Sequence, residues 1–195
     1  MMLEEQGAPR RLFLALRFTD AERDELEGMA CAAAARMRRG TPALRENLHL
    51  TLAFLGMCDA RTEEAARLAG AAAAEAAGPI SETLGDLGSF TRRRSSVIWR
   101  GVAEESGLRE LQARIAAELK EQDVPFDDRP FVPHVTLVRG AAAQQGEDID
   151  KILADLSEKL HPLYAHHAEV ALMWSHHPEG SPLIYTPVAR FPLLA

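Results

Sequence analysis

Two stretches of the chain share one pattern: Glu46-Asn47-Leu48-His49-Leu50-Thr51-Leu52-Ala53-Phe54-Leu55-Gly56 and Arg129-Pro130-Phe131-Val132-Pro133-His134-Val135-Thr136-Leu137-Val138-Arg139-Gly140. Each contains a histidine, an aliphatic residue, a threonine and a leucine in that order, and each apolar run ends at a glycine. Such runs are typical of β-strands, in which side chains two residues apart point to the same face. Each strand is therefore predicted to present an imidazole and a hydroxyl together, with its leucines facing the core.

The repetition of the pattern carries more information than either copy. A single His-x-Thr strand is more often a half-buried polar pair than a functional site. Two copies in similar surroundings suggest one acid and one base. His49 and His134 lie far apart in the sequence, so only tertiary folding can bring them together.

Composition and charge narrow the classes of protein. The chain has 195 residues, of which 47% are hydrophobic and 26% charged, as in an ordinary globular protein with a real core. The net charge of -7 argues against a broad nucleic-acid-binding surface, although one phosphate can still be held locally. Cys31 and Cys58 lack a CxxC spacing, and we interpret both as reduced, structural thiols.

The location is predicted from what the sequence lacks. Its apolar runs are too short to span a membrane. The acidic start Met1-Met2-Leu3-Glu4-Glu5-Gln6 lacks the basic and apolar regions of a secretory signal. We therefore expect a cytoplasmic protein without a membrane segment.

Helical and strand patterns alternate along the chain. We predict strands near residues 11–18, 47–56, 83–90, 96–102, 134–140, 169–175 and 183–191, and helices near residues 21–39, 61–77, 107–122 and 147–160. No linker-like segment separates these elements. The order predicts a single bilobal α+β domain over residues 1–195, with two halves that place their histidine strands across one cleft.

Two histidines and two threonines suit the hydrolysis of a phosphodiester. One imidazole takes a proton from the attacking water and the other gives a proton to the departing oxygen, since the reference pKa of histidine is about 6.5. Thr51 and Thr136 can donate hydrogen bonds to non-bridging phosphate oxygens. Strand alternation alone puts Arg139 on the opposite face from His134, so a twist or bulge is needed for Arg139 to bind phosphate.

Nothing in this scheme requires a metal or another cofactor. A Gly-x-x-x-x-Gly-Lys-Ser/Thr loop for a nucleoside triphosphate is also absent from the sequence. A five-membered cyclic phosphate is strained and needs less help to open, so it fits a site built from two imidazoles.

These motifs resemble those of a known family, the two-histidine (2H) phosphoesterases. Within that family, the chain resembles the RNA 2′,3′-cyclic phosphodiesterases, also called 2′-5′ RNA ligases. The resemblance covers nearly the whole chain. It is carried by the two histidine motifs, by Arg11-Leu12-Phe13-Leu14-Ala15-Leu16, and by Gly88-Ser89-Phe90, Val97-Ile98-Trp99, Ser175 and Tyr185. It implies two pseudo-symmetric lobes, whose antiparallel sheets face a central cleft with helices on the outside.

The same resemblance implies an activity and roles for residues. His49 corresponds to the general acid that protonates the 3′ oxygen, and His134 to the general base that activates water, which gives a 2′-phosphate end. Thr51, Thr136 and Arg139 correspond to phosphate ligands. The implied partners are RNA ends or nucleotides with a 2′,3′-cyclic phosphate, and some family members join tRNA halves in reverse, without ATP. We expect this protein to be a monomer.

Alternative interpretations remain open from the sequence. The protein could act on another small cyclic or 2′-5′-linked nucleotide, or bind RNA ends without catalysis. His161, His166, His167, His176 and His177 cluster near the C-terminus, but adjacent histidines in a strand face opposite ways, so we predict no metal site there. The run Arg92-Arg93-Arg94 either steers RNA or is a solvated hairpin tip, and the second interpretation is more usual.

Overall fold

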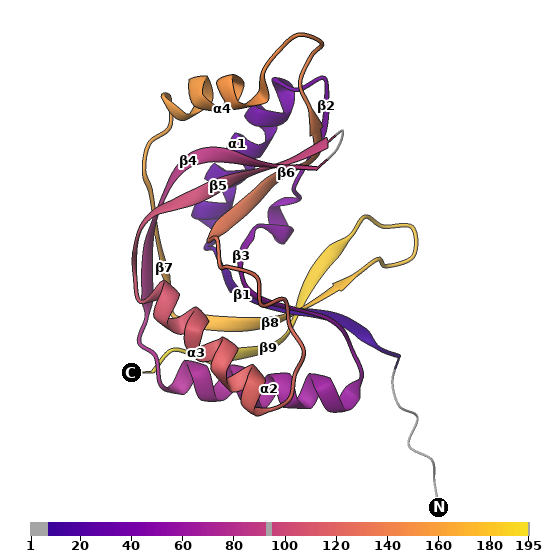
Figure 1. Ribbon diagram of the computed structural model, residues 1–195, viewed down its shortest axis with the longest axis vertical. Coiled ribbons are helices and arrows are strands. Elements are labelled where there is room, and N and C mark those ends of the chain that lie inside the picture. The colour runs from indigo at the N-terminus through magenta and orange to yellow at the C-terminus, as the bar shows by residue number, and fades with distance from the viewer. Residues whose placement is uncertain (1–7, 93–94, 195) are drawn as a thin grey trace, which may run out of the picture.

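The computed structural model describes residues 8–92 and 95–194. Within these residues the chain forms four α-helices, one short 3-10 helix and nine strands (Figure 1). The strands are β1 (Arg10–Arg17), β2 (Arg39–Pro42), β3 (His49–Cys58), β4 (Ile80–Arg92), β5 (Ser95–Ser106), β6 (His134–Ala142), β7 (Leu163–His167), β8 (Glu169–His176) and β9 (Ile184–Pro192). The helices are α1 (Asp20–Ala35), η1 (Arg45–Asn47), α2 (Ala60–Glu75), α3 (Leu108–Glu121) and α4 (Ile149–Ser157).

All nine strands belong to one curled sheet with the order β7-β4-β5-β6-β3-β1-β8-β9, and β2 pairs with the end of β6 from Val138 to Ala142. Neighbouring strands run antiparallel. Helices α1 and α4 cover one half of the curled sheet and α2 and α3 cover the other (Figure 1). The predicted α+β class, with antiparallel strands inside and helices outside, is confirmed.

The two halves meet at a narrow seam between β3 and β6. Only Leu50 and Val135 are paired across it, whereas β1 and β3 are paired over the whole length of β1. Both seam residues are fully buried, because each alternates with a histidine and a threonine that face the other way. The two predicted sheets are thus joined edge to edge at the middle of the histidine motifs.

The predicted end of one helix was wrong, and two strands, β2 and β7, were not expected. The helix expected over residues 21–39 ends at Ala35, so Arg38 and Arg39 lie outside it. Arg39 to Pro42 form β2 instead, because their backbone pairs with β6 between Val138 and Ala142. Strand β7 was not expected, although its residues alternate between buried and exposed. The polar side chains of this segment do not give a clear strand pattern, and the segment forms a strand because its backbone pairs with the edge of β4.

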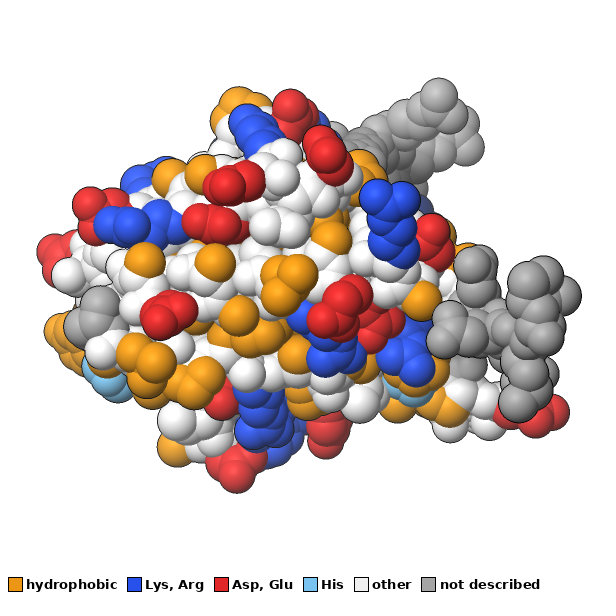
Figure 2. Space-filling view, turned by 90° about the horizontal axis from the view of Figure 1, so that it is seen from below, with side chains coloured by type: hydrophobic (Ala, Val, Ile, Leu, Met, Phe, Trp, Pro, Cys, Tyr) orange, Lys and Arg blue, Asp and Glu red, His pale blue; other side chains and the backbone are white. Residues whose placement is uncertain are grey.

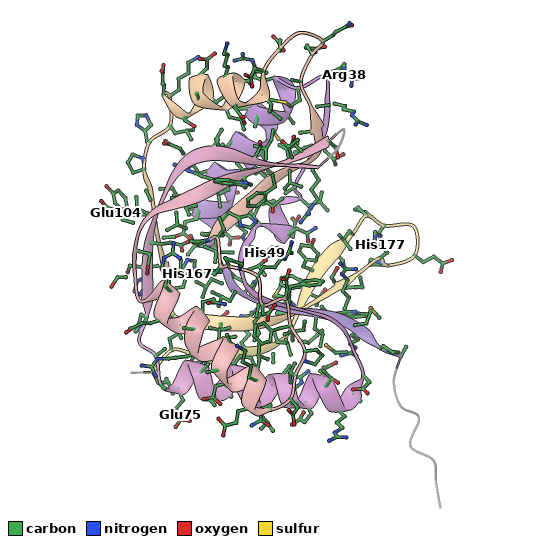
Figure 3. All side chains as sticks on the ribbon, in the orientation of Figure 1. Arg38, His49, Glu75, Glu104, His167 and His177 are labelled. Atoms are coloured by element: carbon green, nitrogen blue, oxygen red, sulfur yellow. The ribbon has the colours of Figure 1, made fainter. Side chains whose placement is uncertain are left out.

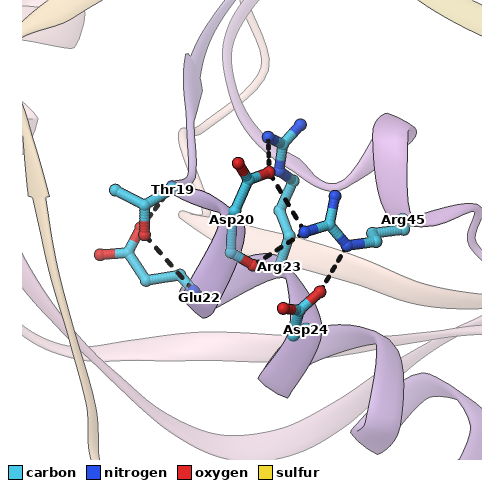
Figure 4. Close-up of polar contacts among 6 residues, drawn as sticks. All are labelled: Thr19, Asp20, Glu22, Arg23, Asp24 and Arg45. Atoms are coloured by element: carbon cyan, nitrogen blue, oxygen red, sulfur yellow. Dashed lines mark hydrogen bonds and ion pairs between the residues drawn. The ribbon is translucent and has the colours of Figure 1, made fainter.

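The segment before His49 is fixed to α1 by charged side chains (Figure 4). Thr19 and Glu22 form a capping box that begins α1. Arg45 of η1 reaches back to this helix and forms ion pairs with Asp20 at 3.1 Å and with Asp24. These pairs are exposed and contribute little to stability, but they define where the chain enters β3.

The described helices include none that is both long and apolar enough to cross a membrane. The acidic stretch Met1 to Gln6, on which the prediction of location partly depends, lies outside the described residues. Both cysteines are free thiols: Cys58 is buried at the end of β3, and Cys31 is exposed on α1. Burial raises the pKa of the Cys58 thiol to about 11.

Candidate active site

A bulge in each histidine strand sets the face on which the later residues lie. In β3 the register against β1 shifts between Leu14–Ala53 and Ala15–Thr51, which leaves Leu52 as the extra residue. Leu52 and Ala53 are both buried although they are adjacent in the strand. Because the bulge inserts one residue into the alternation, Phe54 lies on the same face as His49 and Thr51.

Strand β6 contains the matching bulge. Its register against β5 shifts between Ile98–Val138 and Trp99–Thr136, and both Leu137 and Val138 are buried. Arg139 therefore comes onto the face of His134 and Thr136, as the sequence argument required of a phosphate ligand. Phe54 and Arg139 occupy equivalent positions, each five residues after its histidine.

The seam brings the two motifs side by side. Since Leu50 pairs with Val135 in an antiparallel ladder, the same register places His49 beside Thr136 and Thr51 beside His134. The positive charge of Arg139 acts on both imidazoles, and the charge of His134 acts on His49. The five residues predicted from the sequence thus lie in one place.

The two histidines are held in the same way. His49 Nδ1 lies 2.6 Å from the Asn47 carbonyl oxygen, and His134 Nδ1 lies 2.7 Å from the Val132 carbonyl oxygen. A carbonyl oxygen only accepts hydrogen bonds, so Nδ1 carries the proton and donates in both rings. This leaves Nε2 of each neutral ring as the nitrogen that can gain and lose a proton.

The surroundings of the two rings differ. His49 packs against the rings of Phe13 and Tyr185, with centroids 4.8 and 5.2 Å away, and its Nε2 lies 3.0 Å from Thr51 Oγ1. In the neutral ring this nitrogen accepts a hydrogen bond from the Thr51 hydroxyl. His134 packs against Phe90 of β4 at 4.9 Å and Trp99 of β5 at 6.1 Å.

Burial and positive charge weaken the binding of a proton to both rings. Burial lowers the pKa of His49 to about 4, and the charges of Arg139 and His134 act in the same direction. Burial and then Arg139 also lower the pKa of His134. Both rings are therefore neutral near pH 7 without a ligand. A bound phosphate anion raises both pKa values, since it favours the charged form.

A pocket of about 520 Å³ opens beside His49. It extends from the seam to His177 on the β8–β9 hairpin, which projects from the body of the molecule (Figures 1 and 3). The lining residues are Arg11, Phe13, His49, Thr51, Phe54, Arg139, Ser175, His177, Leu183 and Tyr185. His134 and Thr136 are not part of this lining and lie beside it across the seam.

The charge of the pocket contrasts with that of the whole chain. As far as the described residues go, its lining contains two arginines and two histidines but no Asp or Glu, whereas the chain has a net charge of -7. On the face formed by α2 and α3, acidic, basic and apolar side chains are intermixed instead (Figure 2). A concave site lined by one sign of charge attracts an anion.

Comparison with known proteins now identifies the family. A sequence profile of the 2′-5′ RNA ligase superfamily matches residues 24–179. The chain belongs to this superfamily. The resemblance inferred from the two histidine motifs is thereby confirmed.

Three similar proteins illustrate the relationship. A protein of Escherichia coli named RNA 2′,3′-cyclic phosphodiesterase is 34% identical over 140 residues, which cover 69% of this chain and 74% of the relative. A protein of Geobacillus stearothermophilus with the same name is 34% identical over 130 residues, which cover 65% of this chain but only 41% of that longer relative. The crystal structure of E. coli LigT complexed with 3′-AMP is 28% identical, with a TM-score of 0.73, and the match covers 95% of this chain and 98% of that one.

Asn47 is a site residue of this superfamily member that the strand pattern did not reveal. Its backbone carbonyl orients His49, while its side chain donates to the Leu183 carbonyl at 2.8 Å and accepts from the Tyr185 backbone N–H at 2.9 Å. It thus ties the start of β3 to β9, more than 130 residues away. A contact between such distant segments leaves no local signal in the sequence.

Gly88 is a second such residue. A Cβ at this position would lie 2.3 Å from the Trp99 ring, so only glycine allows the indole to lie across β4. Trp99 in turn supports Phe90 and His134. Trp99 is partly exposed and forms a wall beside His134.

Of the C-terminal histidines noted in the sequence, His177 lies at the pocket, while His166, His167 and His176 lie outside its lining. His167 is buried beside Glu82, and His166 is exposed near Ser81. His176 stacks on Trp174, while His177 lines the pocket. Among the described residues, no group of three His, Cys, Asp or Glu side chains is arranged to hold a metal. Arg93, Arg94 and the side chain of Arg92 lie outside the described residues.

Proposed function

We propose that this protein is an RNA 2′,3′-cyclic phosphodiesterase that opens the cyclic phosphate at an RNA 3′ end to a 2′-phosphomonoester. One observation carries the proposal: two imidazoles from different strands are each fixed through Nδ1 to a carbonyl, which leaves Nε2 for proton transfer beside a shared arginine. Acid–base catalysis needs two such nitrogens near one phosphate.

In the proposed mechanism His134 Nε2 removes a proton from a water molecule as the water oxygen attacks phosphorus. The bond from phosphorus to the 3′ oxygen breaks, and His49 Nε2–H gives its proton to that oxygen. The phosphate remains on the 2′ oxygen. Arg139 balances the charge that develops on the phosphate, and Thr51 and Thr136 donate hydrogen bonds to its non-bridging oxygens. No step draws on a metal ion.

The lowered pKa of His49 fits this role once substrate binds. A general acid must hold its proton in the complex although the free ring is neutral near pH 7. The cyclic phosphate brings a negative charge into a partly buried site, where charges interact more strongly than in water. Binding of the anion therefore raises the pKa of His49 and loads it with a proton.

Hydrolysis of a nucleoside 2′,3′-cyclic phosphate in excess EDTA tests the proposal. We expect turnover to the 2′-phosphate by the intact protein and loss of turnover in both His49→Ala and His134→Ala, with the three proteins equally folded by circular dichroism. A Ser81→Ala variant, remote from the pocket lining, serves as the matched control. Formation of the 3′-phosphate, or binding without turnover, would contradict the proposal and favour another phosphodiester or a recognition module.

The remaining expectations belong to the same proposal. Microscopic reversibility lets the same residues join RNA ends, including tRNA halves, through a 2′-5′ bond without ATP. We propose a single bilobal domain over residues 1–195, a monomer located in the cytoplasm. The main buried core supports one domain, since it includes Leu14, Leu50, Leu84 and Val135 from both sides of the seam. Size-exclusion chromatography tests the monomer.

A further inference from the structure

Arg11 is a cation of the pocket that the proposed chemistry does not use. It lies on β1, where it pairs with Ser175 of β8, and both residues line the pocket. Its guanidinium lies over the Phe54 ring, 4.9 Å from the ring centre. Among the described residues, no carboxylate forms an ion pair with it and no acceptor takes a hydrogen bond from it. The aromatic contact orders the side chain while its N–H donors stay available.

The preceding residue shows the contrast. Arg10 points to the opposite face of β1, where it forms an ion pair with Glu63 at 3.3 Å and lies over Trp174. Its charge is therefore partly balanced by a carboxylate of α2. Within the described part of the chain, Arg11 has an aromatic partner but no such carboxylate, as expected for a side chain that receives an anion from outside the protein.

Arg11 acts on a different part of a ligand from Arg139. The charge of Arg139 lowers the pKa of both catalytic histidines, whereas that of Arg11 contributes to neither shift. Phe13 lies between Arg11 and the reacting end, with its ring 4.8 Å from His49. Two residues of β-strand span roughly 6.6 Å, so the backbone of Arg11 lies about that far along β1 from Phe13, on the side of Phe13 toward Ser175.

The symmetry of the two motifs points to the same conclusion. Arg139 and Phe54 occupy equivalent positions after the two bulges, but only one of them is a cation. At the Phe54 position the positive charge comes from Arg11 instead, whose guanidinium lies over the Phe54 ring. The pocket therefore has two cations, Arg139 on β6 beside the imidazoles and Arg11 on β1 over the Phe54 ring.

We propose that Arg11 binds the phosphodiester that joins the terminal nucleotide to the one before it, so that the protein selects RNA ends over mononucleotides. The inference rests on the proposed function, because it takes the cyclic phosphate to lie between His49 and His134. An extended single strand then leaves the seam along β1 toward the β8–β9 hairpin. The planar guanidinium suits bidentate binding of the two non-bridging oxygens.

The test compares a dinucleotide that ends in a 2′,3′-cyclic phosphate with the corresponding mononucleotide. We expect Arg11→Gln to lower kcat/KM for the dinucleotide about tenfold more than for the mononucleotide. Arg10→Gln is the matched control, and we expect it to leave the ratio between the two substrates unchanged. The slope of log kcat/KM against log salt should fall by about 0.7 in Arg11→Gln for the dinucleotide, the value for one phosphate contact on a single strand.

A dinucleotide with a methylphosphonate in place of the internal phosphate identifies the group that Arg11 recognises. We expect kcat/KM of the intact protein to be about tenfold lower on this substrate than on the natural dinucleotide. Arg11→Gln should show no further loss of kcat/KM. An equal loss for Arg11→Gln on mononucleotide and dinucleotide would overturn the inference. A loss that persists with the methylphosphonate would also overturn it, and would show that Arg11 stacks on a base.

Failure of the proposed function gives a different result. If the intact protein hydrolyses neither substrate, the reaction assignment is wrong whatever Arg11 does. The affinities of a dinucleotide and a mononucleotide that both end in a 2′-phosphate then test the inference by calorimetry. A preference for the dinucleotide that is lost in Arg11→Gln supports it, and equal affinities contradict it.

Discussion

Strands β3 and β6 begin with nearly the same sequence and form the same local structure in different surroundings. In each, the histidine Nδ1 donates to the carbonyl two residues before it, and a bulge follows the threonine. His49, however, is enclosed by Phe13 and Tyr185 and bonded to Thr51, while His134 packs against Phe90 and Trp99 of the β4–β5 hairpin.

The comparison shows which properties are local. The short motif determines the tautomer and the face of each ring, because these depend on the backbone of one strand. The proton affinity depends on neighbours from other strands, and burial lowers the pKa of His49 to about 4. A repeated motif can thus supply two groups of the same chemical type with different tendencies to hold a proton.

The largest expected effect comes from removing either ring. We expect His49→Ala and His134→Ala each to lower kcat by about 10²–10⁴-fold, the usual contribution of one acid or base. Because the two rings act in one reaction, the double variant should lose much less than the product of the single losses. Single-turnover kinetics measures all three. Fully multiplicative losses would mean that the two motifs act independently.

Arg139 acts on both histidines, so its removal tests whether the two rings respond alike. We expect Arg139→Gln to lower kcat/KM about 10–100-fold, since a hydrogen bond to a charged group is worth about 1.5–3 kcal/mol. The pKa of both histidines should rise, because the charge of Arg139 lowers both. NMR titration of the imidazoles measures this shift. Arg129→Gln, at an exposed arginine paired with Asp127, should change neither quantity.

The wall beside His134 can be disturbed without touching the histidine. We expect Gly88→Ala to destabilise the protein by about 1–3 kcal/mol, because the added Cβ meets the Trp99 ring. Gly28→Ala is the matched control in α1, where no atom lies within 4 Å of the added Cβ. It should stabilise by about 0.5–1 kcal/mol. Urea denaturation measures both, and equal effects would contradict the packing argument.

The burial of His49 makes stability depend on pH. The folded protein keeps this ring neutral down to pH about 4, while the unfolded chain binds a proton near pH 6.5. The unfolded state therefore binds more protons in this window, so stability is lost as pH falls from about 6.5 to 4. We expect His49→Gln to remove about 1–2 kcal/mol of this loss, and His134→Gln less. Denaturant titrations at several pH values measure this loss of stability in both variants. A larger reduction of the loss in His134→Gln than in His49→Gln would contradict the difference between the two rings.

The sequence predicted the faces of His49, Thr51, His134 and Thr136, because strand alternation is a local property. It left Arg139 on the wrong face, since a bulge adds one residue to the count. Each bulge corresponds in the sequence to two adjacent apolar residues that interrupt the alternation, Leu52-Ala53 in β3 and Leu137-Val138 in β6. The roles of Asn47 and Gly88 depend on contacts with distant strands, and β2 depends on pairing with β6. Neither kind of contact is visible in a local pattern.

The pH dependence of kcat/KM for a nucleoside 2′,3′-cyclic phosphate tests most directly whether the two rings work as an acid and a base. Both pKa values are lowered in the free protein, so we predict a bell-shaped profile with its maximum below pH 6.5. The maximum of kcat should lie at a higher pH, because the bound anion raises both pKa values. A profile of kcat/KM that is flat from pH 4 to 8, or highest above pH 7.5, would contradict the paired roles of His49 and His134.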